Sequence, residues 1–434
     1  MKDISLAYEK KIIGFLISYY RKENGLSVER ILHNKKIHYE QYCLECTRCK
    51  DKEMICSNKT LRKIENGELV KNDCIYYRLS ENLNKSICFQ RSTYSLIYRL
   101  RVMIYENLID FSYTKLSKIL STLTLEMTKH RNEIYVYEIL SFYHDLMTYR
   151  THGTLPETEQ LNLYLYLFEK VEGVDSKLMS SFLYNISLQI NQLYVKRNQF
   201  IENHLNDLED DPLFFQIKVM RIADQDLLDA YFDIHHEMKQ SLNLYQKYIL
   251  YNYKGYVEMN TRDYKRAYET MRVCLQMIEE GADFGPYITQ GILRRIGMIS
   301  FYLKDYEKTI EYLDRALMNE VTMLGMQAVF LYRSLEKTKQ TDRLKALLNQ
   351  IHLDNIQNEM ERKITIYYKR KYQSEPLTKK QMSELEDYIC EEIKPFLNRM
   401  GDLLKNIFLD DLLNYVEKTS NYKKLYLYEN KEES

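Results

Sequence analysis

Two segments of the chain repeat one another at a fixed distance, and this repeat is the strongest constraint on the fold. "YNYKGYVEMNTRDYKRAYETMRVCL" and "LRRIGMISFYLKDYEKTIEYLDRAL" align with a shift of 42 residues, which places Gly255 over Gly297. In each segment the glycine precedes a small residue, Ala267 or Thr309, by 12 positions. Fixed-period similarity between paired helical segments is typical of a solenoid of helical hairpins. The sequence therefore predicts an all-α fold with a repeat domain over residues 92–434; a helical bundle with a chance match is the alternative.

The rest of the chain is equally favourable to helices. Only 12 Gly and 5 Pro occur among 434 residues, and the first proline is Pro156. The N-terminus lacks the small-residue cleavage site of a signal peptide, and no run of about 18 apolar residues predicts a membrane span. Eight cysteines without a secretion signal favour a reducing compartment over a disulfide framework. We therefore expect a cytoplasmic protein.

Residues 1–91 are predicted to form a separate domain of four short helices. They contain 18 Lys and Arg against 12 Asp and Glu, a net charge of +6, whereas the remaining residues contain 44 against 50, a net charge of −6. A basic module joined to an acidic body favours a polyanionic partner. Ser27, Ser57 and Asp73 are expected to cap the second, third and fourth helices, and Gly67 to end the third.

The third predicted helix, residues 57–66, is a candidate DNA-reading helix. Leu61 and Ile64 lie one turn apart and are expected to face the core, which directs the polar residues outward. Lys and Arg neutralise phosphates, while Asn and Arg also read base edges in the major groove. The alternative is an ordinary solvated helix face. The predicted DNA-binding residues are Ser57, Asn58, Lys59, Thr60, Arg62 and Lys63.

A family resemblance supports the DNA-reading interpretation. "GLSVERIL" followed by "ICSNKTLRKIENGELVKNDCIYYRL" resembles the Xre-type helix-turn-helix, and most closely the peptide-sensing regulators of the PlcR, Rgg and PrgX kind. The motif positions of that family are filled here by Cys56, Ser57, Thr60, Leu61, Ile64, Glu65 and Gly67. The resemblance implies a DNA-binding domain followed by a degenerate tetratricopeptide-like domain that binds a short signalling peptide. It also implies a core role for Cys56.

One feature departs from this family. About 20 extra residues, "HNKKIHYEQYCLECTRCKDKEM", stand between the second helix and the DNA-reading helix, which the family joins by a few residues. The standard crossing of the two helices then requires that this insertion, predicted over residues 34–56, be rigid.

The insertion carries a cysteine cluster with C-x2-C-x2-C-x6-C spacing. Two thiolates from each C-x2-C turn can share one tetrahedral zinc ion, which would brace the loop. The predicted ligands are Cys43, Cys46, Cys49 and Cys56, with His33 and His38 in reserve. Three alternatives remain open: an iron–sulfur cluster, a redox switch, and cysteines without a ligand.

The concave face of a helical solenoid is expected to bind the ligand. Side-chain amides there can hold the backbone of an extended peptide. The predicted peptide-binding residues are Asn185, Gln189, Asn252, Arg295 and Tyr302. For any single one of them, a surface or core role without a ligand is the alternative.

These observations predict a sequence-specific transcription regulator and not an enzyme. The chain has no phosphate-binding Gly-rich loop and no H-E-x-x-H motif. Its expected partners are double-stranded DNA, a short peptide and a second copy in a homodimer. Two alternatives are a metal- or redox-sensing regulator that uses Cys43 to Cys56, and a repeat scaffold for protein interactions that does not bind DNA.

Overall fold

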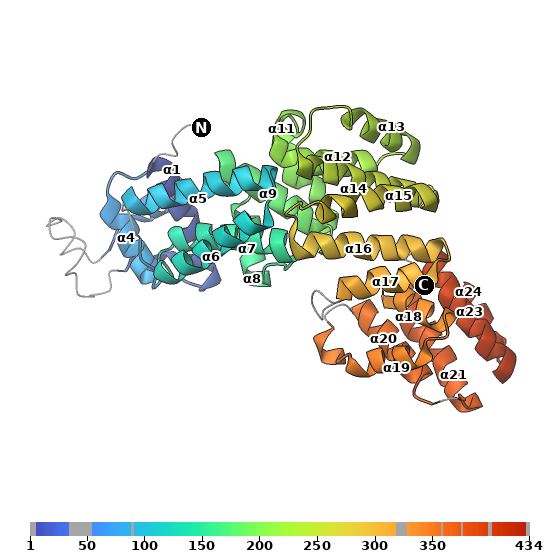
Figure 1. The fold of residues 1–434 in the computed structure, drawn as a ribbon. Coiled ribbons are helices and arrows are strands. Elements are labelled where there is room, and N and C mark those ends of the chain that lie inside the picture. The colour runs from blue at the N-terminus through green and yellow to red at the C-terminus, as the bar shows by residue number, and fades with distance from the viewer. Residues whose placement is uncertain are drawn as a thin grey trace. The chain divides into compact units, whose positions relative to one another are not determined.

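The computed structural model describes residues 6–33, 54–87, 91–317, 328–356, 359–374, 376–397 and 402–430. Within these ranges the chain is helical, and the only β-type pairings are isolated bridges at His33–Met54 and Ser86–Glu133 (Figure 1). The predicted all-α fold is therefore confirmed. The chain divides into two compact units: unit 1, residues 1–250 with 282–287, and unit 2, residues 251–281 with 288–434.

The first four helices of unit 1 form a small group. α1 contacts α3 and α4, and α2 contacts the same two helices. Their bounds are α1 Leu6–Glu23, α2 Val28–Leu32, α3 Asn58–Glu65 and α4 Asp73–Asn82. The fourth helix begins one residue earlier than predicted: Asn72 is the cap, because its side chain accepts a hydrogen bond from the Cys74 amide at 3.2 Å. Asp73 is the first residue of the helix, and its carboxylate lies 2.6 Å from Lys10 Nζ on α1.

Longer helices complete unit 1. Their bounds are α5 Arg91–Ile109, α6 Tyr113–Lys129, α7 Val136–His152, α8 Thr158–Leu167, α9 Gly173–Ser187, α10 Asn191–Tyr194, η1 Arg197–His204, α11 Asp207–Asp210, η2 Pro212–Phe214, α12 Phe215–Ala223 and α13 Leu227–Glu237. Helices α5, α6 and α7 contact one another in all three pairs, and α1 contacts α8. The group α1–α4 is therefore packed on the following helices, and the domain boundary at residue 91 stays a prediction.

A buried ion pair joins the helices at the centre of unit 1. Arg101 on α5 donates two hydrogen bonds to Asp175 on α9, at 2.8 and 2.7 Å, and the Tyr143 hydroxyl on α7 donates a third at 2.6 Å. All three side chains are almost fully buried. Removal of either charge would leave the other without a partner in the core, which typically costs about 3–5 kcal/mol.

Unit 2 contains the segments in which the repeat was recognised. Helices α14 Leu244–Asn260 and α16 Gly285–Tyr302 contribute residues to both units. The helices wholly in unit 2 are α15 Tyr264–Glu279, α17 Tyr306–Leu317, α18 Ala328–Lys337, α19 Thr341–Gln350, η4 Leu353–Asn355, α20 Glu359–Lys371, α21 Lys379–Tyr388, the π-helix η5 Ile389–Ile393, α22 Lys394–Leu397, α23 Asp402–Thr419 and α24 Lys423–Asn430. Consecutive helices from α17 to α21 contact one another, as in a stack of hairpins.

Three hairpins share one turn. The second residue after the first helix of each hairpin is left-handed: Arg262, Lys304 and Lys339 have φ of 62°, 61° and 60°. In each case the next amide closes the turn by donating to a carbonyl five residues earlier, as from Asp305 to Ser300 at 2.9 Å. This geometry ends one helix and aims the chain into the next. The hairpin that lacks the glycine therefore has the same turn as the two that carry it.

The repeated glycines are positions of close helix approach. A Cβ atom at Gly255 would lie 2.8 Å from the Met271 Sδ atom, and one at Gly297 would lie 2.7 Å from Leu313 Cδ2. The small residues that follow at 12 positions, Ala267 and Thr309, are both fully buried. The spacing of 12 positions between the glycine and the small residue is therefore explained by the close contact between the two helices of each hairpin.

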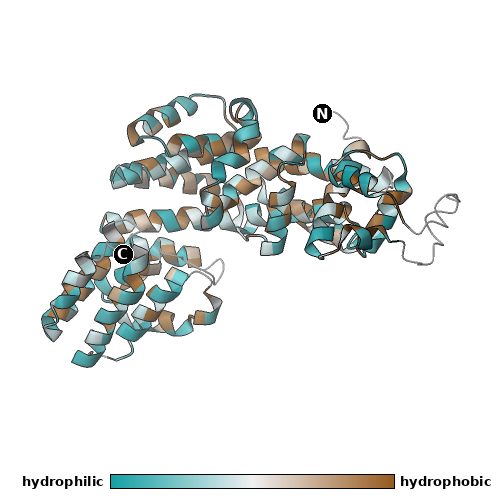
Figure 2. Cartoon of the chain, turned by 180° about the vertical axis from the view of Figure 1, so that it is seen from behind, coloured by the Kyte–Doolittle hydropathy of each residue, from teal (hydrophilic) through white to brown (hydrophobic). Residues whose placement is uncertain are grey.

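Most helices have one apolar and one polar face, and Figure 2 shows hydrophobic and hydrophilic residues alternating along them. Such amphipathic helices bury one side in a protein core. Among the described residues, no helix combines the length and the apolar character that crossing a bilayer would demand.

Candidate DNA-reading helix and ligand site

Helix α3 presents a polar and basic face to solvent. Ser57 caps it, because the Ser57 Oγ atom accepts a hydrogen bond from the Thr60 amide at 3.2 Å. Leu61 and Ile64 are 0% exposed, so one face is committed to the core. The other predicted DNA-binding residues surround that face: Asn58, Lys59, Arg62 and Lys63 are exposed and Thr60 is half-buried. The predicted orientation is present, and the role of these residues in DNA binding stays a prediction.

Helix α1 supports α3 through direct backbone contact. A Cβ atom at Gly14 would overlap the carbonyl oxygen of Ile64, so only glycine lets the two helices approach this closely. Gly67 ends α3 with φ of 75°, as expected, and its amide donates to the Ile64 carbonyl at 2.9 Å. The position of α3 is therefore fixed by its neighbour as well as by its own sequence.

A bidentate ion pair also fixes α3 to α1. The Arg21 guanidinium donates to both carboxylate oxygens of Glu65, at 2.5 and 3.1 Å, and to the Leu26 carbonyl at 3.1 Å. Paired hydrogen bonds of this kind restrict orientation as well as distance. On the outer face, Lys63 Nζ lies 3.5 Å from the Glu68 carboxylate, and both side chains are about half exposed. Arg62 has no ion-pair partner among the described residues.

The ends of the insertion are held together. His33 and Met54 form an antiparallel bridge, and the Ile55 amide donates to the Leu32 carbonyl at 2.9 Å. The buried Asn82 side chain on α4 donates to the Ile31 carbonyl at 2.7 Å and to the His33 carbonyl at 2.9 Å. Helices α2 and α3 therefore contact each other although residues 34–53 separate them. Ile55 is 8% exposed and belongs to the core, and the predicted bounds of the insertion, residues 34–56, stay a prediction.

Most of the predicted metal site lies outside the described residues: Cys43, Cys46, Cys49 and the reserve ligand His38. Cys56 is half-buried next to the cap Ser57, and burial raises the pKa of its thiol to about 11. His33 is exposed. Within the described ranges, no three His, Cys, Asp or Glu side chains are grouped to hold a metal ion. The zinc site and its alternatives therefore stay predictions.

Helix α1 also contacts the helices that follow the N-terminal group. The Tyr20 hydroxyl donates to the Glu138 carboxylate on α7, and the Tyr166 hydroxyl on α8 donates to the Phe15 carbonyl at 3.2 Å. Lys85 Nζ lies 3.7 Å from Glu138. The helix that supports α3 is thus tied to α7 and α8 by polar contacts.

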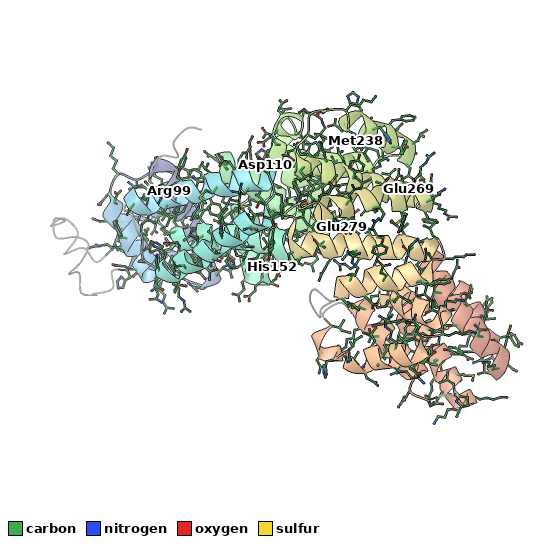
Figure 3. The ribbon with its side chains drawn as sticks, in the orientation of Figure 1. Arg99, Asp110, His152, Met238, Glu269 and Glu279 are labelled. Atoms are coloured by element: carbon green, nitrogen blue, oxygen red, sulfur yellow. The ribbon has the colours of Figure 1, made fainter. Side chains whose placement is uncertain are left out.

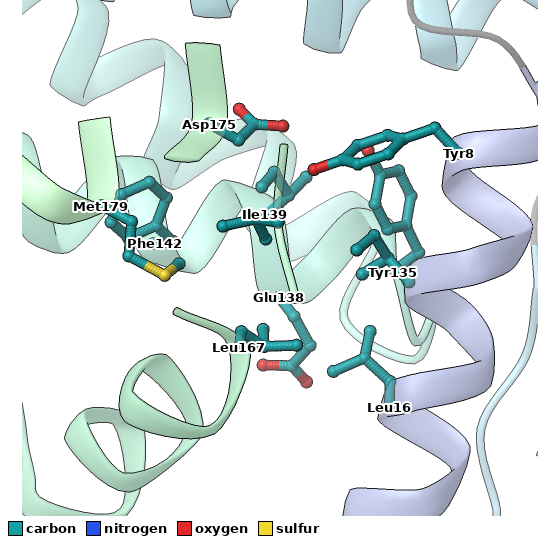
Figure 4. Close-up of a pocket in the computed structure, with 11 residues that line it drawn as sticks. Tyr8, Leu16, Tyr135, Glu138, Ile139, Phe142, Leu167, Asp175 and Met179 are labelled. Atoms are coloured by element: carbon teal, nitrogen blue, oxygen red, sulfur yellow. The ribbon is translucent and has the colours of Figure 1, made fainter. Parts of the chain in front are cut away.

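A small cavity lies along this contact between α1, α7 and α9. It has a volume of about 10 Å³, enough for about one water molecule. Figure 4 shows Tyr8 and Leu16 of α1 facing Glu138 and Ile139 of α7, with Asp175 of α9 beside Tyr8.

Two carboxyl groups near this contact are protonated more readily than usual. Burial raises the pKa of Glu9 to about 8, although the charge of Arg101 and a hydrogen bond with Tyr94 oppose the shift. Burial also raises the pKa of Glu138, against the opposing effects of the Tyr20 hydrogen bond and the Lys85 charge. Desolvation disfavours the charged form of each acid.

The two predicted peptide-binding residues of unit 1 lie around one tyrosine. The Tyr149 hydroxyl donates to the Asn185 carbonyl at 3.3 Å, and the exposed Gln189 amide donates to the Tyr149 oxygen at 3.4 Å. The Asn185 side chain is buried, and its Nδ2 atom donates to the Ser181 carbonyl in its own helix at 2.7 Å. Asn185 therefore positions its neighbours, and Gln189 is the amide that solvent can reach.

Sequence reasoning missed an arginine beside these residues. Arg150 on α7 donates to Gln216 at 2.7 Å and to the Tyr245 hydroxyl at 2.8 Å, and both partners are neutral. Its guanidinium lies 5.9 Å from the Phe111 ring centre, and its buried Nε atom has no partner. No carboxylate in the described part of the chain pairs with it. Arg150 and Asn185 line one cavity of about 10 Å³. The only sequence signal is a basic residue near the end of an apolar helix.

The three predicted residues of unit 2 have structural partners. The Arg295 guanidinium donates to the Asn252 side-chain oxygen, and Asn252 is 8% exposed. The Tyr302 ring stacks on Tyr264 with centres 4.4 Å apart, and burial raises the pKa of its hydroxyl. The structure thus joins Asn252 to Arg295 and places Tyr302 in packing between helices.

Comparison with models of known protein families and with curated proteins found no match to this chain.

Proposed function

We propose that this protein is a sequence-specific DNA-binding transcription regulator whose helical repeat domain senses a short peptide. The observation that carries the proposal is the division of α3 into two faces. Leu61 and Ile64 hold the helix in the core, while Asn58, Lys59 and Arg62 face solvent. A short helix braced by a preceding one is the arrangement with which helix-turn-helix proteins read the major groove. Two copies in a dimer would place two such helices about 34 Å apart, one turn of DNA.

The DNA-binding half of the proposal is tested with the double variant Arg62→Ala/Lys63→Ala. Bound genomic fragments are first captured and sequenced, and affinity for one of them is measured by fluorescence anisotropy at several salt concentrations. We expect at least a tenfold loss of affinity. The slope of log affinity against log salt should also be shallower by about 2, since each lost phosphate contact removes about 0.9.

The control is Lys239→Ala/Lys247→Ala, which removes two exposed lysines elsewhere in unit 1. This variant should bind DNA like the parent. Equal binding by the parent and the Arg62→Ala/Lys63→Ala variant would refute the assignment of α3 as the reading helix. Failure of the parent to retain any fragment at low salt would favour the protein-interaction scaffold.

The ligand half of the proposal rests on Arg150 and its neighbours. A half-buried cation without a carboxylate partner is unfavourable until an anion reaches it. Tyr149 lines the same cavity as Arg150, and Gln189 donates to the Tyr149 hydroxyl. The hydroxyl and the amide are groups that can bind a peptide backbone. We therefore assign Arg150 to the free carboxylate of a short peptide and Gln189 to its backbone.

Helix α7 supplies a physical route from this site to the DNA-reading helix. Glu138 near its start pairs with Tyr20 of α1, and Arg150 near its end belongs to the ligand site. Twelve residues separate the two, about 18 Å along a helix. A shift of α7 on ligand binding would therefore act on α1, which directly supports α3.

A library of free-acid peptides of five to eight residues, with C-terminally amidated copies, tests the ligand site. Binding is measured by fluorescence anisotropy to the parent and to Arg150→Gln, which keeps a polar side chain but removes the charge. Peptides that bind the parent should bind Arg150→Gln at least tenfold more weakly. Their amidated copies should bind the parent at least tenfold more weakly than the free acids do. A bound peptide indifferent to both changes would refute the carboxylate assignment while leaving the DNA assignment intact.

A further inference from the structure

A groove lies between α5 and α6, and the proposed function does not use it. Its volume is about 360 Å³, within the range of ligand-binding clefts. Leu100 and Ile119 form a buried floor, each 3% exposed, and Met103 is 46% exposed at its edge. The lining residues are Leu96, Arg99, Leu100, Met103, Asn107, Lys115, Lys118, Ile119 and Thr122.

The edge of the groove is positively charged. Arg99, Lys115 and Lys118 line it and are exposed, and no Asp or Glu does so. Arg99 donates one long hydrogen bond, to the Ser95 carbonyl at 3.4 Å, and none of the three forms an ion pair within the described ranges. Figure 3 shows Arg99 on α5. Three uncompensated cations around an apolar floor complement a ligand that is both apolar and acidic.

The spacing of the lining residues fits a third helix. On α5 they recur at positions 96, 99, 100, 103 and 107, and on α6 at 115, 118, 119 and 122. Steps of three and four residues keep side chains on one side of a helix, and two such stripes form the groove into which an amphipathic helix packs.

The cations are distributed along the groove. Because a short turn connects α5 to α6, Lys115 lies near the end of the groove that contains Asn107, whereas Arg99 lies toward the other end. Eight residues separate positions 99 and 107, about 12 Å along a helix. One anionic head group, as in a fatty acid, could meet only one or two of these charges. The apolar floor is unsuited to a nucleic-acid backbone, whose contacts are with phosphate and sugar.

We propose that the α5–α6 groove binds an amphipathic helix with acidic flanks, supplied by a partner protein. The apolar stripe of that helix covers Leu100, Met103 and Ile119, and its carboxylates meet Arg99, Lys115 and Lys118. The site is separate from the ligand residues around Arg150 and from α3. It gives the protein a means of recruiting a partner in addition to binding DNA.

The test uses the full-length protein and two labelled 14-residue helical peptides. Both carry leucines at steps of three and four residues; one has glutamates beside the leucine stripe and the other has lysines there. Fluorescence anisotropy should show at least tenfold tighter binding of the glutamate peptide. The Lys115→Glu/Lys118→Glu variant should lose that preference, while the charge-matched control Lys239→Glu/Lys247→Glu should keep it.

A second variant and two further ligands separate the alternatives. Met103→Gln should weaken binding of the glutamate peptide, because it makes the apolar edge of the groove polar. The preference for the glutamate peptide over the lysine peptide should remain, because the three cations are unchanged. Dodecanoate and a DNA duplex are measured with the same proteins. The proposal is overturned if the parent does not bind the glutamate peptide, if Lys115→Glu/Lys118→Glu leaves the preference unchanged, or if that variant alters only dodecanoate or only DNA binding. Circular dichroism checks that each variant is folded. The Lys115→Glu substitution should be compatible with folding, because it places a carboxylate in the first turn of α6, where the helix dipole favours a negative charge.

Discussion

The connection between α2 and α3 and the turns inside the repeat hairpins perform the same task by different means. Each must hold two consecutive helices at a fixed angle. In the repeats, one left-handed residue, such as Lys304, and one backbone hydrogen bond are sufficient. Between α2 and α3, a bridge at His33 and Met54 and a side chain from a third helix, Asn82, take their place.

The difference is between local and long-range control of geometry. A hairpin turn is determined by a few neighbouring residues, so it repeats wherever those residues repeat. The angle between α2 and α3 depends on Asn82, 49 positions from His33, and on the approach of Gly14 to Ile64, which are 50 positions apart. Single substitutions in the N-terminal group should therefore cost more stability than matched substitutions in the repeats.

Gly14→Ala and Gly297→Ala make the most direct comparison. The added methyl at Gly14 meets the Ile64 backbone, which cannot rotate away, whereas at Gly297 it meets the flexible side chain of Leu313. We expect Gly14→Ala to destabilise the N-terminal group by about 3 kcal/mol or more. Gly297→Ala should cost about 1 kcal/mol or less, because alanine also improves helix propensity by about 1 kcal/mol.

Hydrogen–deuterium exchange resolved by peptide gives a separate stability for each region, which a single melting temperature would not. Protection should fall in α1 and α3 for the first variant and stay near the parent value in α16 and α17 for the second. Equal losses of protection in the two variants would show that the contact between Gly14 and the Ile64 backbone adjusts to an added methyl group as easily as the contact between Gly297 and Leu313.

Asn82→Ala is expected to have the next largest effect. It removes two hydrogen bonds, at 2.7 and 2.9 Å, and leaves the carbonyls of Ile31 and His33 without these donors. The loss should be about 2–3 kcal/mol, observed as faster exchange in α2 and α3. Asn66→Ala, which truncates an exposed amide at the end of α3, serves as the control and should change little. A result for Asn82→Ala that matches this control would mean that the bridge alone closes the turn.

Features that depend on neighbouring residues, such as helix caps, helix ends and hairpins, could be predicted from the sequence. Ser27 and Ser57 cap α2 and α3, Gly67 ends α3, and the 42-residue repeat appears as hairpins with identical turns. The cap of α4 was misplaced by one residue because Asn72 and Asp73 are both good capping residues and the sequence does not rank them.

Features that depend on distant partners could not be predicted. Nothing near Asn82 in the sequence indicates that it closes the turn after α2. Likewise, Arg150 becomes a candidate anion site only when its neighbours Gln216 and Tyr245 are seen to be neutral. The side chains of Asn185 and Asn252, both predicted to bind a peptide, each have a hydrogen-bond partner inside their own unit, and their role in peptide binding stays a prediction.

The two regions should also respond oppositely to pH. In the folded protein the pKa of Glu9 is about 8, above its ordinary value of 4.5, so unfolding releases a proton between these values. Stability of the region around α1 should therefore fall as pH rises through this window, by up to about 1.4 kcal/mol per pH unit. Glu9→Gln should remove most of this slope.

Asp305 in the repeats shows the opposite sign. Burial alone would raise its pKa, but hydrogen bonds from the Lys308 side chain and backbone hold it below the ordinary 3.8. The ionised Asp305 carboxylate stabilises the folded hairpin above pH 3.8, and this stabilisation is lost as the pH falls below that value. Asp305→Asn should therefore flatten only the acidic end of the profile. Peptide-resolved hydrogen–deuterium exchange between pH 3 and 8 measures the stability of the α1 region and of the Asp305 hairpin separately. The same dependence of stability on pH in these two regions would contradict the comparison.

The smallest effect is expected from shortening the insertion. Replacing residues 35–52 with Asn-Gly leaves His33, Met54 and Asn82 in place. Because these residues close the turn, α2 and α3 should keep their contact. Reducing the loop from about 20 to about 4 residues should even stabilise the domain by about 1 kcal/mol through loop-closure entropy. The same segment moved into the turn after Lys304 should destabilise its hairpin, because it breaks the bond from the Asp305 amide to the Ser300 carbonyl. A loss of several kcal/mol on shortening would instead mean that the cysteine segment, with a bound metal ion, contributes folding energy that the bridge and Asn82 do not provide.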